Sequence, residues 1–287
     1  MTLRLGRRTF ADSATLVMAI VNRTPDSFYD RGATWAEDRA LDRVAQVVEE
    51  GADIVDIGGV KAAPGDVVDD VEEQRRVVGF VGRVRAAHPD VVISVDTWRA
   101  SVGHAACAEG ADLLNDAWGG HDPGLVDVAA DHGAGLVCTH TGGVTPRTRP
   151  HRIEYADVVA SAIADTTAYA ERAVRAGVDP AGVLIDPAHD FGKTTAHSLE
   201  LTRRLGELTA TGWPVLVSLS NKDFVGETLA LPVGERLAGT LAATAVCALA
   251  GARVFRVHEV VPTRQVVDMV ASIAGRRPPA RAVRGLA

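Results

Sequence analysis

Short hydrophobic runs alternate with longer amphipathic stretches along the whole chain. Eight of the runs are rich in Val, Ile and Leu and are almost unbroken by polar residues: 16–22, 53–59, 91–97, 112–118, 135–140, 183–187, 214–220 and 253–259. Continuous hydrophobicity is typical of strands that are covered on both faces in a parallel sheet, whereas a strand with one wet face alternates. The pattern therefore predicts eight buried parallel strands.

The stretches between these runs have the spacing of helices. Apolar residues recur three and four positions apart, as at 35–52 and 71–88, which predicts amphipathic helices. A Gly-Ala join between helix and strand recurs at positions 51, 110, 133 and 251. This repeated unit predicts an α/β fold of the (β/α)8 TIM-barrel type. An open doubly wound sheet is the alternative, but the glycine-rich phosphate fingerprint that it ordinarily carries after its first strand is absent.

One domain is expected from the length. The 287 residues fall within the range of a single α/β barrel. Residues 1–14 are expected to be an N-terminal lead-in and residues 277–287 a C-terminal tail. The segment 141–155, rich in Pro, Gly and Arg, is predicted to be a long loop after the fifth strand and not a second domain.

Composition and charge narrow the classes of partner. The formal net charge is −7 and no dense basic block is present, which argues against nucleic acid or an anionic membrane as the main partner. No apolar run reaches the length of about 20 residues that a membrane span needs. Cys107, Cys138 and Cys247 each lie in an apolar stretch and indicate buried thiols in a reducing compartment. We expect a soluble, cytoplasmic protein.

Polar side chains occur at the carboxyl end of every predicted strand. In chain order they are Asn22, Asp56, Asp96, Asn115, His140, Asp186, Ser220 with Lys222, and Arg256 with His258. This end of a (β/α)8 barrel builds the active site, whereas the opposite end serves stability. A single Asp or Asn here would often cap the next helix. Eight polar strand ends together favour a ligand-binding site.

Three of these residues suit a flat ring. Asp96, Asn115 and Asp186 each follow an apolar strand and supply hydrogen-bond acceptors and an amide. Such a set matches a heterocycle that carries several N–H groups. The residues therefore predict a polar aromatic ring held deep in the barrel.

Another group suits an anion. Lys222, Arg256 and His258 follow the seventh and eighth strands, where barrels of this type commonly bind phosphate. Asn22 follows the first strand and is a candidate to orient the anion or its Mg²⁺, because magnesium takes oxygen ligands and shares them with substrate phosphates. We expect a phosphate ester or pyrophosphate above the ring.

These motifs also carry a family resemblance. The chain resembles dihydropteroate synthase over nearly its whole length. The segment NRTPDSFYDRG at 22–32 is similar to the family's Asn-Val-Thr-Pro-Asp-Ser-Phe loop, and DIGG, ISVDT, LLND, DPAHDFGKT, LSNKD and FRVHE follow in the family's order and spacing. The resemblance implies a homodimeric TIM barrel that joins 6-hydroxymethyl-dihydropterin pyrophosphate to p-aminobenzoate in folate biosynthesis, and that also binds sulfa-type analogues.

The resemblance also implies a role for each matching residue. The pterin would be bound by Asp96, Asn115, Asp186, Lys222 and Phe191, and the pyrophosphate by Asn22, Arg256 and His258, with Mg²⁺ beside Asn22. In the family the bond to pyrophosphate breaks and the aniline nitrogen attacks the electron-poor pterin methylene. No side chain has to act as a nucleophile.

One loop departs from the family pattern. Where the family has Glu-Ser-Thr-Arg-Pro after the second strand, this chain has Val60, Lys61, Ala62, Ala63 and Pro64. In the family the Thr and Arg belong to a mobile lid over the pyrophosphate and the p-aminobenzoate. Two alanines offer neither a hydrogen bond nor a charge, and losing such an interaction typically costs about 3 kcal/mol of barrier.

Other departures lie near the same end of the barrel. Arg23 replaces a Val, Asn221 replaces an Arg, residues 188–190 replace Gly-Ile-Gly and residues 139–141 replace Met-His-Met. Arg23 or Lys61 is a candidate to replace the missing loop arginine, and the alternative is that both lie in solvent. The combination resembles the divergent second copy of the synthase that some bacteria carry.

We therefore expect the pterin site to be kept and dihydropteroate synthesis to be weak or lost. Three alternatives are a fully active dihydropteroate synthase, a non-catalytic relative that binds a pterin, another anion or a partner protein, and a methyl-tetrahydrofolate-type transferase. The last has no need of a pyrophosphate pocket, so Arg256 and His258 count against it.

Overall fold

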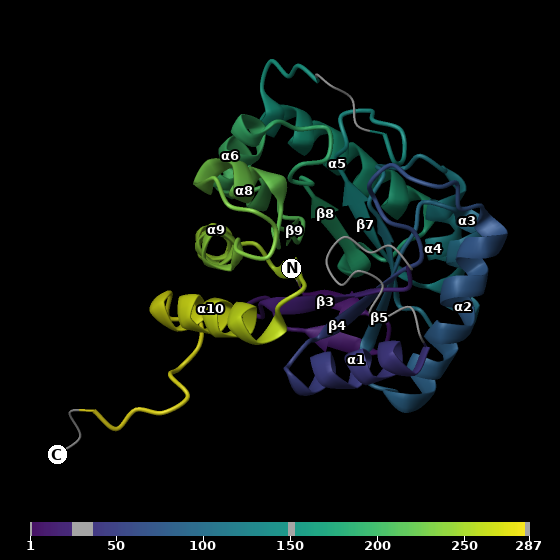
Figure 1. Ribbon diagram of the computed structural model, residues 1–287, viewed down its shortest axis with the longest axis horizontal. Coiled ribbons are helices and arrows are strands. Elements are labelled where there is room, and N and C mark those ends of the chain that lie inside the picture. The colour runs from purple at the N-terminus through teal and green to yellow at the C-terminus, as the bar shows by residue number, and fades with distance from the viewer. Residues whose placement is uncertain (1, 25–36, 149–152, 285–287) are drawn as a thin grey trace.

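Eight parallel strands form a barrel in the computed structural model, which describes residues 2–24, 37–148 and 153–284 (Figure 1). The strands are β3 (Leu16–Asn22), β4 (Ile54–Gly58), β5 (Val92–Asp96), β6 (Leu113–Asp116), β7 (Gly135–Thr139), β8 (Val183–Asp186), β9 (Leu216–Ser218) and β10 (Val254–Val257). Their order is β8-β7-β6-β5-β4-β3-β10-β9. A parallel bridge between Ile185 and Val215 joins the two ends of the series. The predicted (β/α)8 barrel is confirmed, and the predicted strand limits agree to within two residues.

Helices cover the outside of the barrel. They are α1 (Glu37–Glu49), α2 (Asp70–Ala87), α3 (Ala100–Ala108), α4 (Gly124–His132), α5 (Val158–Ala176), α6 (Thr195–Arg203), α7 (Leu205–Thr209), α8 (Asp223–Leu229), α9 (Leu237–Leu249) and α10 (Val260–Ile273), with a 3-10 turn η1 (Pro180–Gly182) before β8. The helices predicted at 35–52 and 71–88 correspond to α1 and α2. Among the described residues, no helix combines the length and the apolar character that crossing a membrane requires.

The main core lies between the strands and the helices. Unbroken runs of apolar residues in the strands face both the helices and the barrel interior, which is why the strands do not alternate. The three cysteines are free thiols within this buried part, as predicted. Burial raises the pKa of Cys107 and of Cys247 to about 12, so these thiols stay protonated at neutral pH.

An antiparallel hairpin covers the amino-terminal end of the barrel. It consists of β1 (Leu3–Leu5) and β2 (Arg8–Phe10), and Leu3, Leu5 and Phe10 pack against the first inward-facing residues of the barrel strands. The sequence analysis treated residues 1–14 only as a lead-in and missed this hairpin. Strands of three residues are too short for their alternation to be recognised.

Truncating Leu5 should destabilise the whole barrel. The side chain is fully buried in this cluster, so Leu5→Ala is expected to lower the free energy of unfolding by about 2 to 5 kcal/mol in urea denaturation, through lost burial and the cavity that remains. Val67→Ala is a matched control, because Val67 is 94% exposed and its loss should cost less than about 0.5 kcal/mol. Equal effects of the two substitutions would contradict a sealing role for the hairpin.

Candidate functional site

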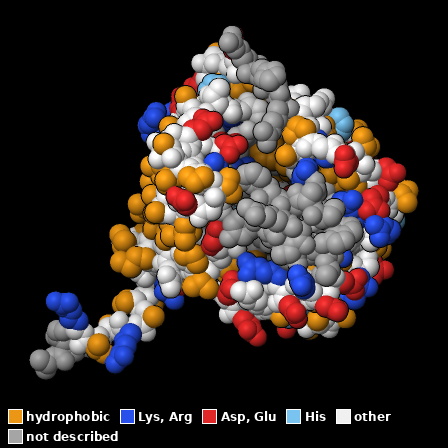
Figure 2. All heavy atoms as spheres, in the orientation of Figure 1, with side chains coloured by type: hydrophobic (Ala, Val, Ile, Leu, Met, Phe, Trp, Pro, Cys, Tyr) orange, Lys and Arg blue, Asp and Glu red, His pale blue; other side chains and the backbone are white. Residues whose placement is uncertain are grey.

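A pocket opens at the carboxyl end of the barrel strands. Its lining includes all eight residues to which the sequence analysis gave a binding role: Asn22, Asp96, Asn115, Asp186, Phe191, Lys222, Arg256 and His258. Figure 2 shows the molecule from the same side as Figure 1, with side chains coloured by type. Residues 25–32, most of the NRTPDSFYDRG motif, lie outside the described residues.

Strand register brings the first part of the site together. Asn22 pairs with Gly58, Gly58 with Asp96, and Asp96 with Asn115, so four neighbouring strands place these residues at one level. Parallel strands in register point equivalent side chains to the same side of the sheet. An amide, a carboxylate and a second amide therefore share one layer of the barrel interior.

Asp56, two residues before Gly58 on β4, links the residues of this layer through hydrogen bonds. It is fully buried on β4, and its carboxylate accepts hydrogen bonds from Ser94 Oγ (2.6 Å), Asn115 Nδ2 (3.3 Å) and Arg256 Nε (2.6 Å). The Arg256 guanidinium also donates from Nη2 to Asp96 Oδ2 at 2.7 Å. Arg256 is thus held between two carboxylates deep in the barrel, beside the residues proposed for the ring and not only near those proposed for the anion.

The two carboxyls of the predicted ring site titrate near neutral pH. Burial, together with the nearby Asp56 carboxylate, raises the pKa of Asp96 to about 7, although the Arg256 charge opposes this shift. Burial likewise raises the pKa of Asp186 to about 6, against the hydrogen bond that Ala188 N–H donates to Asp186 Oδ1 at 2.7 Å. Both groups can change protonation when a ligand binds.

An aromatic wall closes one side of the pocket. Lys222 Nζ lies 4.4 Å from the centre of the Phe191 ring, and Phe191 contacts Trp118 edge to face at 5.2 Å between centroids. Trp118 in turn contacts Trp98 at 6.2 Å, and both indoles are buried. Burial lowers the pKa of Lys222. The wall offers a flat apolar surface beside a cation, which suits a polar aromatic ligand.

The sequence analysis missed a lysine that supports this wall. Lys193 Nζ donates to the carbonyl oxygens of His140 (3.0 Å) and Phe191 (2.8 Å), and burial lowers its pKa to about 7. A signal was available, because the chain has only three lysines among its 30 basic residues. The other two, Lys61 and Lys222, line the pocket.

Arg236 is a second residue that the sequence analysis did not single out. Its Nη1 donates to the carbonyl oxygens of Asn221 (2.9 Å) and Lys222 (3.1 Å) and pairs with Asp223 at 2.9 Å. The arginine therefore holds the turn that carries Lys222. Nothing in the local sequence indicates this role, because every residue has a main-chain carbonyl and the sequence does not show which carbonyls accept a hydrogen bond.

Arg23 lies neither at the pocket nor in solvent, which corrects both expectations for this residue. It is only 7% exposed, and its guanidinium lies 4.9 Å from the centre of the Phe80 ring on α2. The reason is the two-residue period of an extended chain, because Asn22 points into the barrel and the next side chain points to the helices. Lys61 and Ala62 do line the pocket, and Ala63 beside them is partly buried.

Asn221, which departs from the family pattern, and His140, which matches the family's histidine, also face away from the pocket. Asn221 is buried and donates from Nδ2 to Glu259 Oε1 at 3.0 Å. His140 is buried with Nε2 3.1 Å from Ser161 Oγ of α5, and burial lowers its pKa to about 3. The strand-end position of His140 therefore serves packing against α5.

The loop after β8 keeps a backbone shape that favours glycine. Ala188 has φ +50° and Asp190 has φ +69°, at the two positions where the family pattern has glycine. Left-handed conformations of this kind cost about 1 kcal/mol or more for other residues. Asp190 Oδ2 accepts from the amide N–H of Asp223 at 2.6 Å, which helps to offset that cost.

Comparison with known proteins identifies the class to which this fold and pocket belong. Residues 18–258 match the family model described as pterin binding enzyme. Relatives named inactive dihydropteroate synthase 2 are 61% identical in Mycobacterium tuberculosis, over 98% of this chain and 90% of the relative, and 60% identical in Mycobacterium leprae, over 98% of both. A Yersinia pestis dihydropteroate synthase solved with a sulfonamide drug matches with a TM-score of 0.90, 34% identity and coverage of 96% and 100%.

The chain belongs to the pterin-binding enzymes. Within that class it is a member of the dihydropteroate synthase family.

Proposed function

We propose that the protein binds a pterin ring in the barrel pocket and that its dihydropteroate synthase activity is weak or lost. The observation that carries this proposal is the contrast between two parts of one pocket. Asp96, Asn115 and Asp186 line this pocket together, and Ala62 lines it where the family has a hydrogen-bonding threonine.

The pocket chemistry suits a pterin. Ionised Asp96 and Asp186 accept hydrogen bonds from ring N–H and amino groups, and the Asn115 side chain offers both an acceptor and a donor. Phe191 and Lys222 flank the ring on one side. Each contact uses a side chain that the barrel already positions, so little ordering is needed on binding.

The pocket lining also suits a pyrophosphate with its magnesium ion. Asn22, Arg256 and His258 line the pocket, while the described residues contain no cluster of three or more His, Cys, Asp or Glu that would hold a metal alone. Mg²⁺ is commonly bound by one or two protein oxygens together with substrate phosphates, so the Asn22 amide oxygen fits such an ion when the ligand supplies the rest. Bound there, Mg²⁺ would neutralise negative charge on the leaving group.

The residues of the loop after β4 are the reason to expect weak or absent synthesis. The methyl group of Ala62 neither donates nor accepts a hydrogen bond, and Lys61 supplies one ammonium in place of a forked guanidinium. The mycobacterial relatives that share about three-fifths of the sequence are named inactive. We infer that binding of p-aminobenzoate, and of sulfonamide analogues, is the impaired step.

Affinity for the pterin ring should depend on pH. Because the pKa of Asp96 is about 7 and that of Asp186 about 6, both carboxyls take up protons as the pH falls, and a protonated carboxyl no longer accepts from a ring N–H. Calorimetric titration with 6-hydroxymethylpterin should show full affinity near pH 7.5 and about a tenfold loss per pH unit for each protonating carboxyl below its pKa. Asp186→Asn should remove one proton step, and a flat profile for the unaltered chain would contradict the clamp.

The decisive test of function uses both substrates. Purified protein should bind the pterin pyrophosphate in the presence of Mg²⁺ and form little or no dihydropteroate when p-aminobenzoate is added. Turnover at the rate of an ordinary synthase would refute the loss of activity, and absence of any pterin binding would refute the proposal as a whole.

A homodimer through α9 and α10 is the proposed assembly. These helices expose Val246 and Leu249 on α9 and Met269 and Ile273 on α10, and hydrophobic side chains gather on that side of the molecule (Figures 1 and 2). Contiguous apolar surface of this kind marks protein interfaces. Light scattering should give twice the chain mass for the unaltered protein and the single-chain mass for Leu249→Arg, with Val67→Arg as the exposed control. A dimer that survives Leu249→Arg would place the interface elsewhere.

A further inference from the structure

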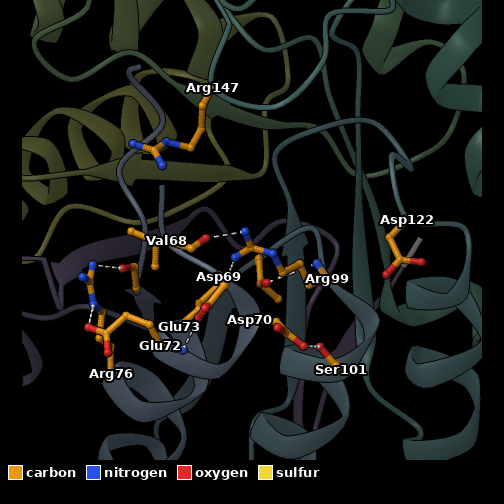
Figure 3. A network of polar contacts seen from close by, with 12 residues as sticks. Val68, Asp69, Asp70, Glu72, Glu73, Arg76, Arg99, Ser101, Asp122 and Arg147 are labelled. Atoms are coloured by element: carbon orange, nitrogen blue, oxygen red, sulfur yellow. Dashed lines mark hydrogen bonds and ion pairs between the residues drawn. The ribbon is translucent and has the colours of Figure 1, made fainter. Parts of the chain in front are cut away.

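The loop between β4 and α2 forms one edge of the pocket, which Val60, Lys61 and Ala62 line. Residues 64–67 are exposed, with Val67 at 94%. Two arginines hold the ends of the loop by its main chain: Arg76 Nη1 donates to Gly59 O at 2.9 Å, and Arg99 Nη2 donates to Val68 O at 2.6 Å (Figure 3). Both contacts lie at the ends of the loop.

A third arginine holds the middle of the loop from another part of the chain. Arg147, in the loop after β7, donates from Nε to Ala63 O at 3.3 Å and from Nη1 to Asp66 O at 2.6 Å. In Figure 3 Arg147 lies above Val68, whereas Arg76 lies below it and Arg99 beside it. One guanidinium thus bridges two carbonyls three residues apart, which fixes the path of the loop.

The backbone at Arg147 is shaped for this contact. Thr148 N–H and Thr148 Oγ1 both donate to Thr145 O, at 3.3 and 2.7 Å, and close a tight turn. Within that turn Arg147 has φ +61°, a left-handed conformation that is unfavourable for a side chain of this size. The residue with this unfavourable backbone conformation is therefore the same residue that contacts the loop after β4.

Lys61 lies next to the same contact. A Cβ atom placed on Gly65 would be 2.8 Å from Lys61 Cε and 3.1 Å from Arg147 Nη2, so both side chains pack against the main chain at Gly65. Lys61 also lines the pocket. The path of residues 63–66 therefore determines where the Lys61 ammonium stands relative to the ligand.

We propose that Arg147 is a positioning residue of the pocket, which holds the loop after β4 and so places the Lys61 ammonium at the pocket edge. Ala62 and Ala63 themselves have no polar side chain, and Arg147 holds the main chain at Ala63 and Asp66 from the loop after β7. The pocket then favours ligands whose anionic group lies on the Lys61 side. This preference for anions rests on the proposed function, whereas the holding of the loop does not.

Digestion with a lysine-specific endoproteinase tests the holding of the loop. The chain has three lysines, so cleavage after Lys61, Lys193 and Lys222 gives separate, identifiable fragments. Arg147→Ala should speed cleavage after Lys61 about tenfold, because cleavage follows the population of the opened loop. Arg147→Lys, which keeps a donor for one carbonyl, should give an intermediate rate.

The control separates a local effect from general loosening. Arg75→Ala removes an exposed arginine of α2 that pairs with Glu72 and should leave all three cleavage rates unchanged. An unchanged rate at Lys61 in Arg147→Ala, or an equal increase at Lys193 and Lys222, would overturn the proposal.

A double-mutant cycle tests whether Arg147 acts through Lys61. Inorganic pyrophosphate is titrated into the unaltered protein, Lys61→Ala, Arg147→Ala and the double variant. Each single substitution should weaken binding about fivefold, and the double variant should be no weaker than Lys61→Ala, since coupled residues give non-additive effects. If the double variant instead binds about 25-fold more weakly than the unaltered protein, which is the product of two fivefold losses, Arg147 does not act through Lys61. If pyrophosphate does not bind the unaltered protein, the proposed function fails, and cleavage at Lys61 still decides whether Arg147 holds the loop.

Discussion

Replacing Asp56 with alanine is expected to lower the free energy of unfolding by about 3 to 5 kcal/mol and to abolish pterin binding. The Asp56 carboxylate is fully buried and accepts from Ser94, Asn115 and Arg256. Its removal leaves the largely buried Arg256 guanidinium, whose side chain is 18% exposed, with Asp96 as its one remaining carboxylate contact among the described residues. Removing one partner of a buried pair is costly because the other charge stays desolvated.

Binding should fail for a geometric reason as well. Without Asp56, the Asn115 amide loses the acceptor that orients it, and Arg256 is free to draw Asp96 away from the ligand. Urea denaturation measures the stability, and calorimetric titration with 6-hydroxymethylpterin measures the binding. Asp131→Ala, on the exposed face of α4, is the control and should change neither quantity. A stability loss below about 1 kcal/mol for Asp56→Ala would show that the network is not needed.

The barrel, and the end of it at which the site lies, were predictable because parallel strands have a recognisable sequence pattern and their carboxyl ends meet at one end of the barrel. Unbroken apolar runs gave the strands, and their carboxyl ends had to meet at one end of the barrel. Asn22, Asp96 and Asn115 therefore could be placed together before any coordinates were known, and register confirms that they share a layer. Their role in binding remains a proposal.

The contacts between loops were not predictable, because they depend on groups that every residue possesses. Arg147 and Arg236 bind main-chain carbonyls, so the residues they hold, Ala63 and Asn221 among them, give no sign of being held. Arg23 shows a second limit. The prediction considered its charge, but the direction of its side chain was set by its place immediately after the inward-pointing Asn22.

Restoring the two family side chains in the loop after β4 should restore measurable synthesis. The double variant Ala62→Thr with Ala63→Arg is expected to form dihydropteroate at least about 100-fold faster than the unaltered chain. Each interaction of this kind is typically worth about 3 kcal/mol of barrier, and one such gain alone corresponds to about two orders of magnitude in rate. The Ala63 carbonyl that accepts from Arg147 belongs to the main chain, so both substitutions leave that contact available.

The matched control is the double variant Ala62→Val with Ala63→Met, which adds similar bulk without a hydrogen bond or a charge. It should remain as inactive as the unaltered chain in the same assay with pterin pyrophosphate, p-aminobenzoate and Mg²⁺. An equal gain in both variants would assign the effect to packing of the loop. No gain in either would assign the loss of synthesis to the other altered strand ends, where Thr139 and Ala188 line the same pocket.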